Sequence, residues 1–154
     1  MCSSDLGSQS LSAETFGAVL DDVLGTFAAQ GVTRMAVLNT GVSTEKPIDA
    51  ATQARPNVLV LHMRLLGQAA EPLIEHPEGG HADERETSVM LALDPRSVRM
   101  DRLAPARPFE LSAATGDPTR ATAFKGERLL AARVDDMVGA IATRWPDLDR
   151  KSTR

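Results

Sequence analysis

Hydrophobic residues recur at helical spacing in residues 12–31, near the start of the chain. Ser12 is a residue type that caps helices, and Gly31 is a residue type that ends them. Between them the large apolar side chains are Phe16, Val19, Leu20, Val23, Leu24 and Phe27. Their spacing of three or four positions predicts a helix with one apolar face.

Two short apolar runs follow, and no polar residue interrupts either of them. Residues 35–38 read Met-Ala-Val-Leu, and residues 58–61 read Val-Leu-Val-Leu. Runs of this kind are typical of strands that are buried in a parallel sheet. The turn-rich residues 39–44 come after the first run, and residues 47–54 predict a short helix that Pro56 ends. This order of elements predicts an open α/β sheet.

A long helix is predicted near the C-terminus. Asp117 would cap it, Pro118 would take its first position, and Pro146 would end it. Its apolar face would consist of Leu130, Val134, Met137, Val138, Ile141 and Trp145. Gly126 lies within this helix, where glycine costs about 1 kcal/mol relative to alanine unless it permits close packing.

Residues 79–95 place one histidine and three acids at the start of another predicted helix. His81 follows two glycines, and Asp83, Glu84 and Glu86 fall in or beside the first turn. The helix dipole stabilises acids there, which is one interpretation of the pattern. A histidine among carboxylates also suits a metal ion or an anionic intermediate. The residues alone leave both interpretations open, an ordinary helix N-terminus or part of a hydrolytic site.

Two segments carry a resemblance to a known family. Residues 81–93 resemble the His-Ala-Gly-Glu-x-Glu-Thr-Ser-x-Met-Leu-Ala-Leu motif of the creatininase (creatinine amidohydrolase) family. Residues 116–126 resemble its Gly-Asp-Pro-x-x-Ala-Thr-Ala-x-x-Gly pattern. Two positions depart from the family. Asp83 replaces a glycine, and Gly41 stands where the family loop carries a metal-ligating histidine.

The resemblance implies a fold and an activity. The fold would be a three-layer α/β/α sandwich with a mostly parallel sheet. The activity would be that of a metal-dependent amidohydrolase, acting on a non-peptide or cyclic amide C–N bond of a small-molecule substrate. His81 would be the catalytic residue, and Glu86 would bind a divalent ion (Zn, Mn or Fe). A homo-oligomer, such as a hexamer, is also implied.

The resemblance also implies that part of the metal site is missing. The family's Glu-x-His pair and bridging Asp come before the segment that residue 12 begins, so we expect an N-terminally truncated fragment without the full ligand set. Such a fragment would be inactive alone. One creatininase-like domain is expected over residues 12–146. The polar ends, residues 1–10 and 149–154, resemble translated sequencing adapters and are expected to be disordered or artefactual.

Two alternative functions remain open. One is a non-catalytic creatininase-like binding or interaction subunit that has lost the metal site, which Gly41 favours. The other is a nucleotide-binding, flavodoxin-like module, which has only the order of strand, loop and helix in its favour. His62 and His76 are expected at a strand end and in a loop, because neither has a partner at a ligand-like spacing.

Composition and charge limit the classes of partner that the chain is expected to bind. The formal net charge is −4 and the basic residues are scattered, which argues against nucleic-acid binding. No stretch is long and apolar enough to predict a membrane span, and the N-terminus lacks a signal-peptide pattern. Cys2 is the single cysteine, so no internal disulfide can form, and a cytoplasmic location is expected.

Overall fold

The structure is a computed structural model that describes residues 10–103 and 115–148. These residues fall into two compact units. The first contains residues 10–66 and 141–148, and the second contains residues 67–103 and 115–140. The expectation for the two chain ends concerns residues that lie, except for Ser10, outside the described ranges. A single domain over residues 12–146 stays a prediction.

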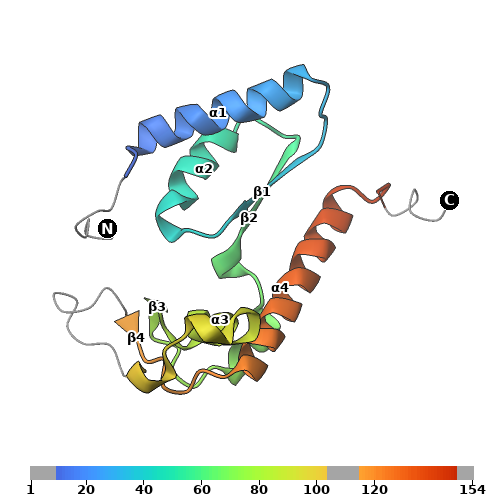
Figure 1. Ribbon diagram of the computed structural model, residues 1–154. Helices are drawn as coiled ribbons and strands as arrows, with labels where there is room; N and C mark the ends of the chain where they lie inside the picture. The colour runs from blue at the N-terminus through green and yellow to red at the C-terminus, as the bar shows by residue number, and fades with distance from the viewer. Residues whose placement is uncertain (1–9, 104–114, 149–154) are drawn as a thin grey trace. The chain divides into compact units, whose positions relative to one another are not determined.

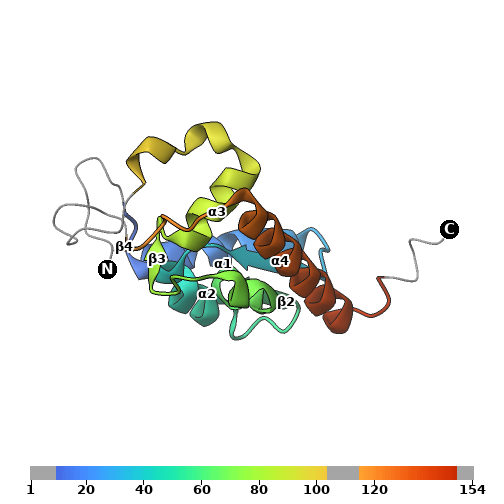
Figure 2. The same cartoon turned by 90° about the horizontal axis from the view of Figure 1, so that it is seen from below.

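The first unit is built on a parallel pair of strands, β1 (Met35–Asn39) and β2 (Val58–His62). They pair in register along their whole length, so their carboxyl ends meet at one edge. Helix α1 (Ala13–Ala29) packs against α2 (Glu45–Thr52), and α2 contacts β2, as Figures 1 and 2 show. The helices and strands predicted for this unit are therefore confirmed, with small changes in their bounds.

The ends of α1 follow the prediction more closely than its buried face does. The Ser12 hydroxyl accepts a hydrogen bond from the Thr15 N–H at 3.1 Å, and Gly31 takes a positive φ of 87° just after the helix. Leu24 is the one buried side chain of the predicted apolar face. Three other members of that face, Val19, Val23 and Phe27, remain exposed.

The second unit joins an antiparallel strand pair to two helices. The strands are β3 (Gly79–His81) and β4 (Thr115–Gly116). The helices are α3 (Glu84–Leu93) and most of α4 (Ala123–Arg144). The core of this unit is formed by Ala70, Ile74 and Leu129. Short 3-10 helices occur in the two units at Val42–Thr44, Met63–Leu65, Gln68–Leu73, Pro95–Ser97 and Met100–Arg102.

The start of α4 corrects the prediction from the sequence. The helix begins at Ala123, and Asp117 does not cap it. Instead, the Asp117 carboxylate accepts hydrogen bonds from the N–H and the hydroxyl of Thr119, at 2.8 and 2.6 Å, and folds a local turn. Such a turn competes with helix formation. The Thr122 hydroxyl takes the capping role, because it accepts from the Lys125 N–H at 3.2 Å.

The buried side of α4 also differs from the predicted face. Leu129 is completely buried, whereas Val134 and Val138 of the predicted face are exposed. Gly126 explains the difference. A β-carbon at this position would overlap the backbone of Ser88 on α3, so α4 turns its glycine toward α3 and buries the residues in line with it. The sequence-based alternative that Gly126 permits close packing is therefore the one that the structure supports.

None of the helices in residues 10–103 and 115–148 combines the length and the apolar character that crossing a membrane requires.

Candidate functional site

A pair of facing glycines fixes the strand that ends at His81. Gly79 on β3 lies opposite Gly116 on β4, and both have positive φ. A β-carbon on Gly79 would lie 2.6 Å from the Thr115 carbonyl oxygen, and one on Gly116 would overlap the Glu78 carbonyl oxygen. Only glycine fits such a close approach of two backbones. The pairing therefore sets the position from which His81 projects.

The turn after His81 is closed by two reciprocal hydrogen bonds. Asp83 is the N-cap of α3, and its carboxylate accepts from the Glu86 N–H at 3.0 Å. The Glu86 carboxylate reaches back and accepts from the Ala82 N–H at 2.6 Å. This arrangement is close to a capping box. Asp83 has an ordinary φ of −82°, so its replacement of the family glycine causes no strain, and the left-handed residue is Ala82.

His81 and Glu86, the two predicted site residues, lie close together. His81 Nδ1 and Glu86 Oε2 are 3.8 Å apart, which is an ion-pair distance and longer than a hydrogen bond. Both side chains are accessible, at 59% and 53% exposure respectively. A histidine that a ligand can reach, beside a carboxylate, is able to carry protons.

Glu84, the third acid of this segment, is a structural residue. Its side chain is completely buried, and its carboxylate accepts from the N–H groups of Glu75 and His76, at 3.0 and 2.7 Å. Lys125 Nζ donates to it at 2.5 Å. Burial raises the pKa of Glu84, but the hydrogen bonds from Lys125 and the two backbone groups outweigh burial and hold that pKa below its ordinary value. Glu84 is therefore ionised, and its carboxylate is occupied by these structural hydrogen bonds.

Lys125 joins Glu84 to a second carboxylate, that of Glu75. Lys125 Nζ lies 2.7 Å from Glu75, and Arg120 lies 2.8 Å from it. Hydrogen bonds from these two cations lower the pKa of Glu75 to about 2. Burial lowers the pKa of Lys125, but the two carboxylates raise it by more, so the net shift is upward. The ammonium group therefore stays charged. The sequence did not reveal this network, because Glu75 lies 45 and 50 positions from its two partners.

The first unit contains a separate polar cluster where β1 and β2 end. Asn39 ends β1 and is buried, and its amide nitrogen lies 3.0 Å from His62 Nδ1. The same nitrogen donates to the Gly41 carbonyl at 2.8 Å. Its amide oxygen accepts from the Gly41 N–H at 3.2 Å and from the Thr44 hydroxyl at 2.6 Å. Asn39 thus uses every donor and acceptor that an asparagine side chain has.

This cluster defines the state of His62. Because the Asn39 amide nitrogen can only donate, His62 Nδ1 must accept, and the proton sits on Nε2. His62 Nε2 then donates to Asp49 at 3.0 Å. The residue ends β2, as the sequence predicted, but its partners lie 13 and 23 positions away and could not be identified from spacing. His76 is likewise in a loop, 3.5 Å from Asp117.

Gly41, where the family carries a metal-ligating histidine, is enclosed by its neighbours. Its backbone is extended, with a φ of −107°, so the conformation itself does not demand glycine. Asn39 holds both its N–H and its carbonyl, and the Thr44 hydroxyl oxygen lies 2.8 Å from that carbonyl. A β-carbon would lie 3.1 Å from the Thr44 hydroxyl. The loop is therefore closed on itself.

The described residues do not form a complete metal centre. No three His, Cys, Asp or Glu side chains gather in a ligand-like group anywhere in the described ranges. His62 pairs with Asp49 in the first unit, and His81 pairs with Glu86 in the second. A protein-bound zinc ion takes at least three protein ligands, so each pair is one ligand short.

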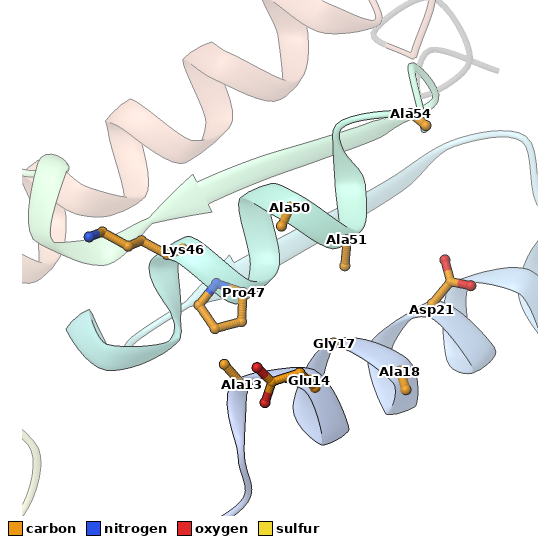
Figure 3. A pocket seen from close by; sticks show the side chains of 10 residues that line it. All are labelled: Ala13, Glu14, Gly17, Ala18, Asp21, Lys46, Pro47, Ala50, Ala51 and Ala54. Atoms are coloured by element: carbon orange, nitrogen blue, oxygen red, sulfur yellow. The ribbon is translucent and has the colours of Figure 1, made fainter.

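A groove of about 650 Å³ lies between α1 and α2. Its lining is mostly small and apolar, and Figure 3 shows Ala50 and Ala51 of α2 facing α1. The charged groups in it are Glu14, Asp21 and Lys46, and Arg55 binds Asp21 at 2.5 Å. The groove contains no histidine or cysteine.

Comparison with solved structures supports the fold. A mutant creatininase complexed with creatine superimposes with a TM-score of 0.73 at 24% identity, over 92% of this chain and 68% of that one. A proposed creatinine amidohydrolase from Bacteroides fragilis NCTC 9343 gives a TM-score of 0.66 at 21% identity, over 89% of this chain and 64% of that one. The predicted α/β fold of the creatininase type is thus confirmed.

Comparison of sequences identifies the family. Mycofactocin precursor peptide peptidases from Mycobacterium ulcerans (strain Agy99) and Mycobacterium tuberculosis (strain ATCC 25618 / H37Rv) are both 38% identical to this chain where they match. The matches span 42% and 45% of this chain, and only 32% and 34% of those relatives. The family described as creatinine amidohydrolase matches residues 4–141, which is most of the chain. This chain belongs to the creatininase family.

Proposed function

We propose that this protein is an amidohydrolase and that His81 and Glu86 form part of its active site. One observation carries the proposal. The family-like motif folds so that an accessible histidine and an accessible carboxylate lie 3.8 Å apart. Membership of a hydrolase family supports the reaction type. The flavodoxin-like alternative has no support from the comparisons.

His81 is the proposed catalytic residue. Hydrolysis of an amide requires a proton on the departing nitrogen, and an exposed imidazole can deliver one. The Glu86 carboxylate lies 3.8 Å from the imidazole, within ion-pair distance. The Ala82 N–H holds that carboxylate at 2.6 Å. The segment therefore presents a hydrogen-bonded carboxylate beside an exposed imidazole.

Glu86 is also the proposed ligand of a divalent ion, either zinc, manganese or iron. Creatininases are generally metal-dependent. The side chains of the described ranges do not complete such a site. A subunit that binds without catalysis is the second candidate function, because Gly41 and Thr44 close the loop in which the family places a ligand.

The proposed substrates are small molecules with an amide C–N bond. The relatives named as precursor peptide peptidases add peptide-derived amides to the candidate substrates. The likeness to creatininase adds cyclic amides. A panel should therefore contain creatinine and short peptide amides, each tested with Zn²⁺ and with Mn²⁺.

The test measures turnover of the full-length protein on this panel. His81→Ala should lower kcat by about 10²–10⁴-fold, the usual contribution of a general acid or base. His76→Ala is the matched control, because His76 is also a partly exposed loop histidine of the second unit. Equal turnover in wild type and His81→Ala would remove His81 from the mechanism. No turnover of any substrate by the metal-loaded wild type would favour the non-catalytic subunit.

A further inference from the structure

Lys125 holds the start of α3 from its buried side. Its ammonium group donates to Glu84 at 2.5 Å, to Glu75 at 2.7 Å and to the Arg120 carbonyl at 3.0 Å. Three bonds use all three donors of a lysine. The side chain is only 12% exposed, so water has little access to these hydrogen bonds. Lys125 is thus committed to this position.

The Glu84 carboxylate is the point where three segments of the chain meet. It belongs to the first residue of α3, it accepts from the N–H groups of Glu75 and His76, and it pairs with Lys125 in the first turn of α4. Glu84 is separated from Glu86 by a single residue. Any movement of the first turn that displaces Glu84 therefore displaces Glu86 as well.

Two further contacts bind α3 to α4 along the same line. The Ser88 hydroxyl accepts from the Thr122 N–H at 3.2 Å. Gly126 lies against the Ser88 backbone without space for a β-carbon. Buried contacts thus fix α3 on the side of α4, whereas His81 and Glu86 are exposed. The anchoring residues and the proposed site residues occupy the same short stretch but differ in burial.

Removing the Lys125 charge would take away the counter-ion that lies 2.5 Å from the completely buried Glu84 carboxylate. Its loss is strongly unfavourable, because a buried carboxylate needs a partner. The strain is relieved if the first turn of α3 moves and brings Glu84 to water. That movement would break the bond from the Ala82 N–H to Glu86, and with it the approach of His81 to Glu86.

We propose that Lys125 is a positioning residue for the His81–Glu86 pair, acting through Glu84. Lys125 does not itself face the pair, since its three donors are taken by Glu84, Glu75 and Arg120. The catalytic meaning of this role rests on the proposed function. The positioning itself is a property of the fold and can be measured without a substrate.

The experiment measures native-state hydrogen exchange at the Ala82 and Glu86 amides by NMR. Both amides donate to side chains of this turn, so their protection reports its closure. In Lys125→Met we expect the exchange rates of both amides to rise about tenfold or more above the increase that the change in global stability alone would cause. Such an excess is the signature of local opening. Leu129→Ala is the control, because it removes a completely buried side chain from the same helix. Leu129→Ala should raise the exchange rates only by the amount that its lower global stability accounts for.

The double variant Glu84→Gln/Lys125→Met decides between positioning and general stabilisation. It removes both charges, so no unpaired carboxylate remains, and we expect protection at Ala82 and Glu86 to return toward the wild-type value. It also keeps the test valid if Lys125→Met alone fails to fold. Protection at these amides that is unchanged in Lys125→Met, or that follows global stability as in Leu129→Ala, would overturn the proposal. Rapid exchange in the double variant would overturn it too.

Turnover separates this proposal from the proposed function. If His81→Ala loses activity while exchange at Ala82 is normal in Lys125→Met, then the function stands and the role of Lys125 fails. If no substrate is hydrolysed by the wild type, the function fails, and the exchange result still decides the role of Lys125. Where both hold, Lys125→Met should lower kcat in parallel with its loss of protection at Ala82.

Discussion

Gly126 on α4 lies against the backbone of Ser88 on α3, so closely that a β-carbon at position 126 would lie 2.0 Å from the Ser88 carbonyl oxygen. This contact places the start of α4 beside the segment that carries His81 and Glu86. It also explains why a helix of 22 residues tolerates a glycine near its beginning.

Gly126→Ala should therefore destabilise the protein. Overpacking of this kind costs about 1–3 kcal/mol, because the backbone of one helix must shift. Gly139→Ala is the matched control on the same helix, since a β-carbon there meets no atom within 4 Å. The control should stabilise the helix by about 1 kcal/mol or less. Urea unfolding measures both values, and equal effects of the two substitutions would contradict the close contact.

The sequence predicted the elements whose signals are local. Ser12 and Gly31 marked the ends of α1 correctly, and the two apolar runs became the parallel pair β1 and β2. Helix α3 begins where the acids at 83, 84 and 86 predicted a helix start, and Asp83 is its cap. These features depend on residues within a few positions of each other, which is the range over which capping and periodicity act.

The sequence failed at one local point, because Asp117 looked like a helix cap but its carboxylate binds Thr119, two positions further on. It failed elsewhere where distant residues decide. The buried face of α4 is set by Ser88, which lies on another helix. For the candidate site, the family motif identified His81 and Glu86, whereas Lys125 could not be found, because its link to Glu84 spans 41 positions. No local pattern in the sequence encodes such a pairing.

The Glu75 carboxylate should make stability sensitive to acid. Its pKa is about 2 in the folded protein, against an ordinary value of 4.5. A lowered pKa means that its contribution is fully present above about pH 4.5 and is lost as the pH falls toward 2. Urea unfolding between pH 7 and pH 3 should show a shallower decline in Glu75→Gln than in the wild type. Glu127→Gln, an exposed change on α4, is the control, and the same decline in all three proteins would contradict the Glu75 network.

The neutral imidazole of His62 should carry its proton on Nε2. The Asn39 amide nitrogen donates to Nδ1, so only that tautomer satisfies both groups. Long-range ¹H–¹⁵N NMR distinguishes the two nitrogens directly. In Asn39→Asp a carboxylate faces Nδ1, and a proton should then appear on Nδ1. A proton on Nδ1 in the wild type would show that the Asn39 side chain is oriented the other way.

Zinc should bind weakly to the 154-residue chain. The described residues offer no group of three ligands, and a single carboxylate such as Glu86 holds a divalent ion loosely. Isothermal titration of the purified chain with Zn²⁺ tests this expectation, and Glu86→Gln should weaken even the residual binding. Tight binding of two ions per chain would mean that a metal centre exists which the described residues do not reveal.

A double-mutant cycle on His81 and Glu86 tests the central claim most directly. The kcat/KM of the full-length protein is measured for the wild type, His81→Ala, Glu86→Gln and the double variant, on the best substrate of the panel. Residues that act as a unit lose activity non-additively. We therefore predict that the double variant loses no more than the worse single variant. Losses that multiply, or single variants as active as the wild type, would contradict a shared site at this pair.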